Sequence, residues 1–306
     1  MVLPVSECML SKFLEEGIFL NKYFKGWYFK MQNDNQIAAV IPAMHIDENS
    51  KKSASIQIIA EDYVGCAWFP YKQFSCRGNR PQVKIANNLF CEQGLKLNVK
   101  TDTITADGNL QFGPLAPIRY DIMGPFCFMP FMECRHSVFS MTHTVNGSLN
   151  INGKKYLFAN DCGYIEGDRG RSFPKIYVWT QCNFFDKSPN SIMLSVAEIP
   201  LGAIHFKGVI GVIFWQGKEY RIATYLGAKV VTVGNRKLVI KQGKLKLTAE
   251  LIKMQDKPLY APVGGNMKRM IHESPSCTAY YCFEENGEKR FEFNTDRAAF
   301  EYEWDN

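Results

Sequence analysis

The sequence predicts an all-β protein made of two tandem β-barrel or β-sandwich units with very little helix. Apolar residues alternate with polar ones along residues 95–100, where Leu95, Leu97 and Val99 take every second place. Such alternation is typical of a strand with one buried face. Turn-forming pairs such as Asn-Gly recur at short intervals, and helix signals are few. Many short strands separated by turns favour a sandwich or a barrel.

The expected elements follow the chain in order. A short helix is predicted over Ser11–Asn21, a strand over Ser53–Ala60, and one or two helical turns over Gly265–Glu273. Turns are predicted at Asp107-Gly108, Asn146-Gly147, Asn152-Gly153, Gly217, Gly234-Asn235, Gly243 and Asn286-Gly287. Asn-Gly pairs favour type I′ turns because both central residues need a positive φ.

The predicted strands exceed what one small barrel uses, so we expect two units, residues 1–132 and 133–306. The boundary falls at the Pro-flanked apolar stretch Gly124–Met132. We favour packing between the two halves for this stretch, because large apolar patches are normally covered. A lid or a membrane-dipping loop over a pocket is the alternative.

Composition excludes several classes of protein. The net charge of +6 is mild, and the basic residues of Lys207–Lys257 alternate with apolar ones, as in residues 244–247. This pattern favours a solvated strand face over nucleic-acid binding; weak attraction to an anionic membrane is the alternative. The ten cysteines form no C-x-x-C motif, which favours free buried thiols in a reducing compartment. We therefore expect a cytoplasmic protein, with peripheral membrane contact left open.

Motifs for nucleotide binding, serine hydrolysis and zinc hydrolysis are missing from the sequence. Its five histidines show no metal-ligand spacing. We therefore expect neither a metal nor a cofactor.

One tract, residues 160–185, carries acids, glycines and aromatics together. Tyr164, Glu166 and Asp168 share parity, so a regular strand places them on one face. A second group shares a face after the Gly170–Pro174 turn: Tyr177, Trp179, Gln181 and Asn183. That face suits the wall of an apolar pocket with a few fixed polar groups. In the alternative interpretation, Glu166 and Asp168 only form ion pairs with Arg169 or Arg171.

Four separated motifs carry a family resemblance: "YFKGWYFK" from Tyr23, "HSVFSMTHTVNGSL" from His136, "GYIEGDRGRSFPKIYVWTQCNFF" from Gly163 and "GKEYRIATYLGAK" from Gly217. In this order and spacing they resemble the tocopherol cyclase-like family, as does "LYAPVGGNMKRMIHES" from Leu259. The resemblance implies two lipocalin-like β units, related to carotenoid hydratases. Three positions depart from the family pattern: Lys25 replaces a usual acid, Arg169 replaces a usual Trp, and Asp168 is Asn in some true cyclases.

The resemblance implies cyclisation of a prenylated quinol or another isoprenoid by protonation of an alkene, with capture of the cation by a phenol oxygen. A buried carboxylic acid suits this step, because desolvation favours its protonated form. Glu166 or Asp168 is the expected donor, with Asp168 slightly preferred. His136 and His143 are further candidates, of which at most one lines the pocket because seven positions separate them.

Aromatic faces then stabilise the cation. The candidates for this role are Trp27, Tyr28, Tyr177 and Trp179. Two other functions stay open from the sequence. One is a carrier that holds a hydrophobic ligand without chemistry, and the other is a hydratase of an isoprenoid double bond.

Overall fold

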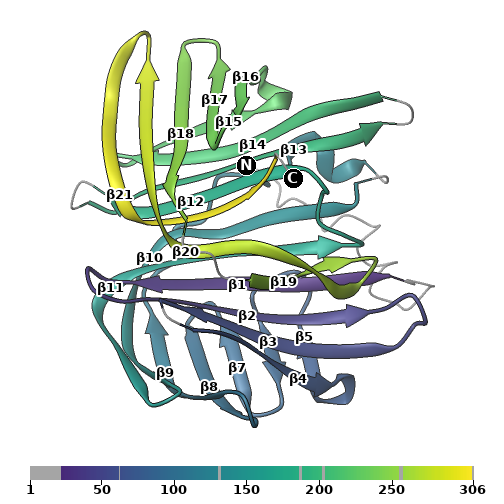
Figure 1. Ribbon diagram of the computed structural model, residues 1–306. Helices are drawn as coiled ribbons and strands as arrows, with labels where there is room; N and C mark the ends of the chain where they lie inside the picture. The colour runs from purple at the N-terminus through teal and green to yellow at the C-terminus, as the bar shows by residue number, and fades with distance from the viewer. Residues whose placement is uncertain are drawn as a thin grey trace, which may run out of the picture.

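The computed structural model describes residues 22–61, 63–129, 132–185, 188–201, 204–254 and 258–304. The predicted helix at Ser11–Asn21 lies outside these residues. Two large curled antiparallel sheets make up the molecule and lie against each other (Figure 1). The structure therefore has the all-β, two-sheet class that the sequence predicted.

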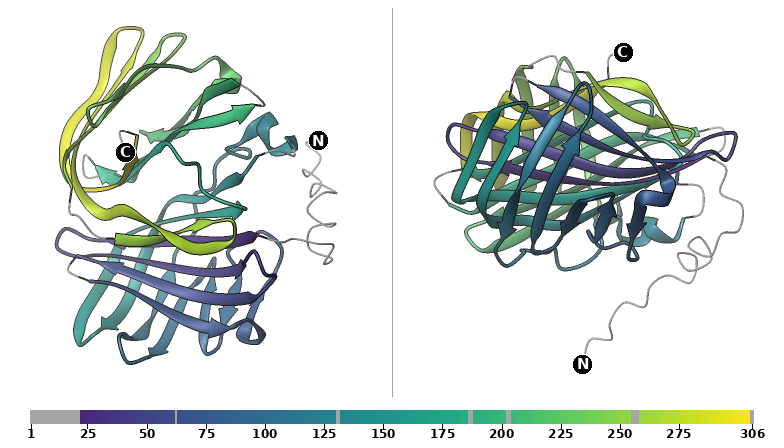
Figure 2. Two further views of the ribbon diagram at one scale, coloured as in Figure 1. Left: turned by 45° about the vertical axis from the view of Figure 1, so that its right-hand side comes forward. Right: turned by 90° about the horizontal axis from the view of Figure 1, so that it is seen from below.

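The first sheet has eleven strands in the order β4-β3-β2-β1-β11-β10-β9-β8-β7-β6-β5. Its strands are β1 (Tyr23–Gln32), β2 (Ile37–Ile46), β3 (Lys52–Ala60), β4 (Val64–Pro70), β5 (Phe74–Cys76), β6 (Val83–Ile85), β7 (Asn88–Cys91), β8 (Gly94–Lys100), β9 (Thr105–Phe112), β10 (Cys134–Ile151) and β11 (Lys154–Gly170). Figure 2 shows how strongly this sheet curls.

The second sheet has the order β15-β14-β13-β12-β21-β20-β18-β17-β16, and β19 pairs with β20 outside this path. Its strands are β12 (Tyr177–Phe185), β13 (Asn190–Leu201), β14 (Ile204–Trp215), β15 (Lys218–Ala223), β16 (Lys229–Gly234), β17 (Lys237–Gln242), β18 (Leu245–Lys253), β19 (Pro258–Val263), β20 (Asn266–Glu285) and β21 (Glu288–Glu303). Three short 3-10 helices, η1 (Tyr71–Gln73), η2 (Gly124–Phe128) and η3 (Thr224–Leu226), complete the described elements.

The chain changes sheets between Gly170 and Tyr177. The first sheet thus runs past residue 132, where the sequence placed the end of the N-terminal unit. The reason is that β10 and β11 hydrogen-bond to β9 and β1 and so extend the first sheet. The acid tract of β11 and the aromatic tract of β12 therefore lie on different sheets.

Each sheet encloses an apolar core, and a third apolar cluster lies between the sheets; we call it the between-sheet layer. It includes Tyr28, Met123, Tyr164, Trp179 and Met193. β2 is buried on both faces, because one face packs in the first core and the other in this layer. That explains its nearly continuous apolar sequence, whereas β8, with one solvated face, alternates.

Turn predictions succeeded where both residues of a pair have positive φ. Asn152-Gly153 links β10 to β11 with φ of 48° and 83°, and Asn286-Gly287 links β20 to β21 with 58° and 82°. Gly217, Asn235 and Gly243 also lie between strands.

Three element predictions were wrong. Asp107-Gly108 and Asn146-Gly147 lie inside β9 and β10. Of the segment predicted as helical turns, Gly265 lies in the turn before β20, and residues 266–273 form the start of that strand. At Gly108, a Cβ would come within 2.2 Å of the Ser148 carbonyl oxygen. This glycine therefore serves the close approach of two strands rather than a turn.

The segment predicted as a boundary carries η2. Phe126 and Cys127 pack against the between-sheet layer, which agrees with the favoured interpretation of packing between the halves. Phe128 is instead 71% exposed. In the described residues, no helix has the length and apolar character needed to cross a bilayer, and all cysteines there are free.

Candidate active site

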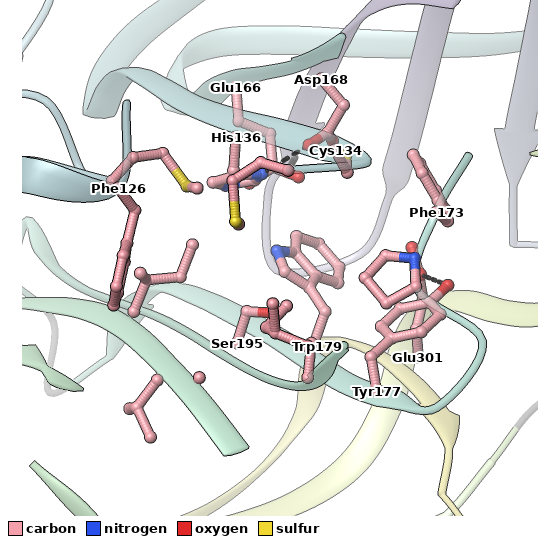
Figure 3. Close-up of a pocket in the computed structure, with 18 of the residues that line it drawn as sticks. Phe126, Cys134, His136, Glu166, Asp168, Phe173, Tyr177, Trp179, Ser195 and Glu301 are labelled. Carbon is pink, nitrogen blue, oxygen red and sulfur yellow. Dashed lines mark hydrogen bonds and ion pairs between the residues drawn. The ribbon is translucent and has the colours of Figure 1, made fainter. Parts of the chain in front are cut away.

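A cavity of about 110 Å³ lies between the two sheets (Figure 3). Its polar lining comprises Cys134, His136, Glu166, Asp168, Tyr177, Ser195 and Glu301, and its apolar lining includes Met123, Phe126, Met132, Phe173, Pro174, Trp179, Ala197, Ile199, Phe206, Val209 and Ile210. We call it the first cavity. Six titratable side chains therefore meet at a largely apolar cavity, and that combination favours a functional site.

His136 and Asp168 come together through strand pairing. They are directly opposite in the antiparallel β10–β11 pair, and Val138 is opposite Glu166. Since opposite and diagonal neighbours on one face of a sheet are in reach of each other, His136 lies beside both acids. Its Nδ1 is 2.9 Å from Asp168 Oδ1 and its Nε2 is 3.1 Å from Glu166 Oε2. We call these three residues the acid cluster.

Tyr164 extends the cluster toward the interior. It precedes Glu166 by two positions on β11, and its hydroxyl donates a hydrogen bond of 2.5 Å to Glu166 Oε2. At the Asp168 end of the cluster, the Cys134 thiol lies 3.4 Å from Asp168 Oδ1. The shared face of Tyr164, Glu166 and Asp168 is thus confirmed in the structure.

Burial and charge act in opposite directions on His136. Burial by itself lowers the pKa of the imidazole, but the carboxylates of Asp168 and Glu166 outweigh it and hold this pKa well above its usual value. His136 is therefore an imidazolium at neutral pH. Burial, followed by the charge of Glu166, raises the pKa of Tyr164 well above its usual value, so Tyr164 stays protonated and donates.

Arginine does not neutralise these acids. Arg169 follows Asp168 and so faces the other side of β11, where its guanidinium donates to Ser137 Oγ at 3.3 Å. Within the described ranges, no ion pair joins either carboxylate to Arg169 or Arg171. The interpretation of Glu166 and Asp168 as partners of these arginines is therefore not supported by the geometry.

Aromatic residues of β12 and of the preceding loop form the wall opposite the acid cluster. Trp179 lies across the cavity from His136, and Tyr177 and Phe173 lie beside it (Figure 3). The Trp179 ring makes an edge contact with Tyr28 at 5.8 Å between centroids. Trp179 Nε1 is buried and has no hydrogen-bond partner among the described residues. Among the described residues, the Trp179 indole N–H is therefore an unused donor at the wall of the first cavity.

Gln181 and Asn183 continue the predicted face of β12, but they do not line the first cavity. Gln181 Oε1 accepts from Lys30 Nζ at 3.0 Å, and its amide donates to Asn183 Oδ1. Asn183 Nδ2 donates to the Met141 carbonyl at 2.7 Å. These two residues tie β12 to β1 and β10 across the sheets.

His143 lies away from the acid cluster, which supports the expectation that only one of the two histidines reaches the pocket. Bulges in β10 between Val138 and His143 shift the strand register. The His143 ring packs on Phe112, with 4.7 Å between ring centroids, and its Nδ1 lies 3.0 Å from Ser140 Oγ. Burial lowers the pKa of His143 to about 4, so it is neutral at pH 7.

Trp27 and Tyr28 point to opposite sides of β1. Trp27 belongs to the first core, and Tyr28 belongs to the between-sheet layer. Neither lines the first cavity, and both border a smaller second cavity on the other side of Glu166 and Asp168.

The acid cluster also has the ligand types of a metal site, since its donor atoms lie within 4.8 Å of one another. In a metal site one imidazole nitrogen and the carboxylates converge on a common point. Here the imidazole instead lies between two carboxylates: its Nδ1 hydrogen-bonds Asp168, and its Nε2 lies at ion-pair distance from Glu166. This arrangement fits a proton shared along a row of groups better than a bound metal.

The family model named "Tocopherol cyclase-like" matches residues 104–262. This is more than half of the chain. The chain belongs to the tocopherol cyclase-like family.

Curated relatives of this family member are weakly similar in sequence. A probable chloroplastic tocopherol cyclase of Oryza sativa subsp. japonica is 26% identical over 38% of this chain and 26% of its own length. A chloroplastic tocopherol cyclase of Zea mays is 22% identical over 40% of this chain and 27% of its own. The matches thus span about a quarter of those plant proteins.

Solved structures share the fold over nearly the whole chain. Kievitone hydratase from Nectria haematococca has a TM-score of 0.54 at 12% identity and covers 93% of this chain and 90% of its own. CghA gives 0.55 at 10% identity, covering 93% and 89%. A putative AttH from Nitrosomonas europaea gives 0.52 at 9% identity, covering 95% of both chains.

Sequence reasoning missed several lining residues of this tocopherol cyclase-like protein. Glu301 comes from β21, and its carboxylate accepts a hydrogen bond from the Tyr177 hydroxyl. Phe126 and Phe173 lie in the segments that precede β10 and β12. Glu301 lies between Phe300 and Tyr302 near the buried end of β21. An acid between two aromatic residues was the signal that the sequence offered.

Proposed function

We propose that this protein catalyses the cyclisation of a prenylated quinol, or of a related isoprenoid, by protonating an alkene inside the first cavity. The observation that carries the proposal is the acid cluster at the wall of an apolar enclosure, with His136 bridging Asp168 and Glu166. Family membership supports the reaction class. A cytoplasmic location and peripheral membrane contact remain further proposals.

Asp168 is the proposed proton donor. Glu166 Oε2 already receives the Tyr164 hydroxyl and faces His136, so its role is to orient the imidazole. The Asp168 side chain is 21% exposed against 6% for Glu166, and it is therefore the more accessible acid. When substrate displaces water, the lower dielectric favours neutral groups over the His136–Asp168 ion pair. The shared proton then resides on Asp168.

The reaction needs one proton and returns it. Asp168 transfers its proton to the less substituted alkene carbon, and the alkene π electrons form the new C–H bond. The tertiary cation that results is captured by a lone pair of the phenol oxygen, which forms the C–O bond. The phenolic proton then returns to the acid cluster. The overall step is an isomerisation that consumes no cofactor.

Opposite the donor, the aromatic wall stabilises the cation. Trp179, Tyr177 and Phe173 lie across the cavity from the acid cluster. A desolvated cation over an aromatic face gains about 2 kcal/mol or more. The apolar lining excludes water, which would otherwise capture the cation.

Incubation of the purified protein with a prenylated hydroquinone tests the proposal. We expect a product of unchanged mass with one fewer exchangeable proton, detected by mass spectrometry after exchange into deuterated water. In the same solvent, one deuterium becomes bonded to carbon. A product heavier by one water would instead assign hydration, and ligand uptake without any product would assign a carrier.

The geometry favours an enzyme over a carrier. A carrier interpretation expects Glu166 and Asp168 to be neutralised by arginine. Instead both acids face His136, and such coupled titratable groups in a cavity are typical of catalytic sites.

A further inference from the structure

The second cavity has a volume of about 70 Å³ and shares Glu166, Asp168, Phe173 and Glu301 with the first. The two cavities therefore adjoin at the acid cluster. The lining that belongs to the second cavity alone includes His45 and Gln57, two buried polar side chains. The first cavity continues instead toward the apolar residues of β13 and β14.

Small side chains create this space. In the first sheet, Asp168 is opposite Gly26, Gly26 is opposite Ala43, and Ala43 is opposite Ser55. Directly opposite residues share a face of the sheet, so this row of small residues runs from the acid cluster to Ser55. Because the side chains in this row are small, they leave the second cavity open beside Asp168.

His45 closes the far end of the row. His45 is 3% exposed, and its Nε2 lies 2.8 Å from Ser55 Oγ. Its Nδ1 is buried and has no hydrogen-bond partner among the described residues. Leaving a buried polar atom unpaired costs about 1–3 kcal/mol, and a ligand in the cavity can supply the partner.

We propose that the second cavity is the subsite for the oxygenated ring edge of the substrate, and that His45 Nδ1 hydrogen-bonds a ring hydroxyl there. The inference rests on the proposed function, since it assigns the two ends of that substrate. The apolar chain then lies in the first cavity, and the reacting alkene lies at the acid cluster where the cavities meet.

The protonation state of His45 suits a hydroxyl group as its ligand. Burial lowers its pKa to about 4, so the imidazole is neutral at pH 7. A neutral imidazole has one donor and one acceptor nitrogen, and the Ser55 hydroxyl adapts to either tautomer. A ring hydroxyl likewise adapts, whereas a methyl ether only accepts and carries extra bulk.

Binding of a non-reactive ligand pair tests the subsite separately from catalysis. The probes are a hydroquinone with a saturated branched alkyl chain and its dimethyl ether, measured by titration calorimetry on the full chain. We expect the wild type to bind the free hydroquinone at least about tenfold more tightly than the ether. His45→Leu should reduce this ratio to less than twofold, with the ether bound as well as before.

Gly26→Ala is the second variant, in case His45→Leu does not fold. A Cβ at Gly26 has its nearest neighbour at 3.4 Å, an ordinary contact, so the fold should tolerate it while the cavity shrinks. We expect weaker hydroquinone binding in Gly26→Ala. The matched control is Ala197→Val in the first cavity, which should weaken the hydroquinone and its ether equally.

Two outcomes would overturn the subsite. One is equal binding of both probes to the wild type, which means that the cavity holds only water. The other is unchanged discrimination in His45→Leu together with unchanged hydroquinone affinity in Gly26→Ala. Failure of the proposed function is a separate result. In that case the protein binds the saturated alkyl hydroquinone more tightly than its ether, as expected, but it does not convert the unsaturated hydroquinone.

Discussion

His136 and Asp168 are directly opposite in the pair of β10 and β11, and His136 Nδ1 lies 2.9 Å from Asp168 Oδ1. Thirty-two positions separate the two residues in the chain. The hairpin turn at Asn152-Gly153 sets the start of this pairing, and the bulges of β10 adjust it before His136 is reached.

Replacing Asp168 by Asn removes the proposed donor and keeps the shape of the side chain. We expect turnover to fall by at least about 100-fold, the usual contribution of a general acid, with ligand affinity within about threefold. Single-turnover kinetics and calorimetry separate the two quantities. Asp102→Asn, at an exposed loop position, is the control. Wild-type turnover in Asp168→Asn would remove Asp168 from the mechanism.

Tyr164→Phe tests the hydrogen bond that holds Glu166. The variant keeps the ring in the between-sheet layer but loses the hydroxyl that donates to Glu166 Oε2. We expect about a tenfold lower turnover number with an unchanged KM, because Glu166 orients His136 only indirectly. A lower turnover number together with a raised KM would instead indicate disrupted packing, which a melting curve would reveal.

The stability of the protein should depend on pH through His136. Its folded pKa is raised by Asp168 and Glu166, so its ion pairs stabilise the fold below the unfolded pKa of about 6.5. This contribution disappears as the pH rises through the raised folded pKa. Urea unfolding between pH 6 and pH 10 measures the effect. His136→Gln should flatten the alkaline decline, and an unchanged decline would assign it to other groups.

Acid should destabilise the protein through His143. Burial lowers the pKa of His143 to about 4, whereas the unfolded value is about 6.5. The contribution of neutral His143 to the free energy of unfolding is therefore complete above the unfolded pKa. It is lost as the pH falls toward the folded pKa, by up to about 3 kcal/mol. His143→Gln should reduce this loss without lowering turnover. A large loss of activity with intact stability would place His143 in the reaction instead.

Trp179 can be tested in two steps. Trp179→Phe keeps an aromatic face but removes the unpartnered indole N–H, and Trp179→Leu removes both. If the face stabilises the cation, we expect about tenfold or greater further loss of turnover from Phe to Leu. Equal turnover in the two variants would leave the N–H as the only contribution of Trp179.

Much of this protein was determined locally and could be predicted from the sequence. Alternation in residues 95–100 specified a strand with one solvent-exposed face, and Asn152-Gly153 specified a turn. Both the strand and the turn depend on residues that are neighbours in the chain. The common face of Tyr164, Glu166 and Asp168 followed from the two-residue period of a strand. Motif order alone sufficed to predict the family.

Only the tertiary structure decided the features that depend on which strands pair with each other. Asn146-Gly147 became part of a strand because β9 and β11 pair with β10 on both sides. Glu301 reached the cavity from the last strand, and the row Gly26–Ala43–Ser55 became a hollow only once three strands were aligned. Contacts between residues far apart in the chain depend on register and on which sheet a strand joins. Local alternation restricts the register only to every second position, and it does not determine which sheet a strand joins.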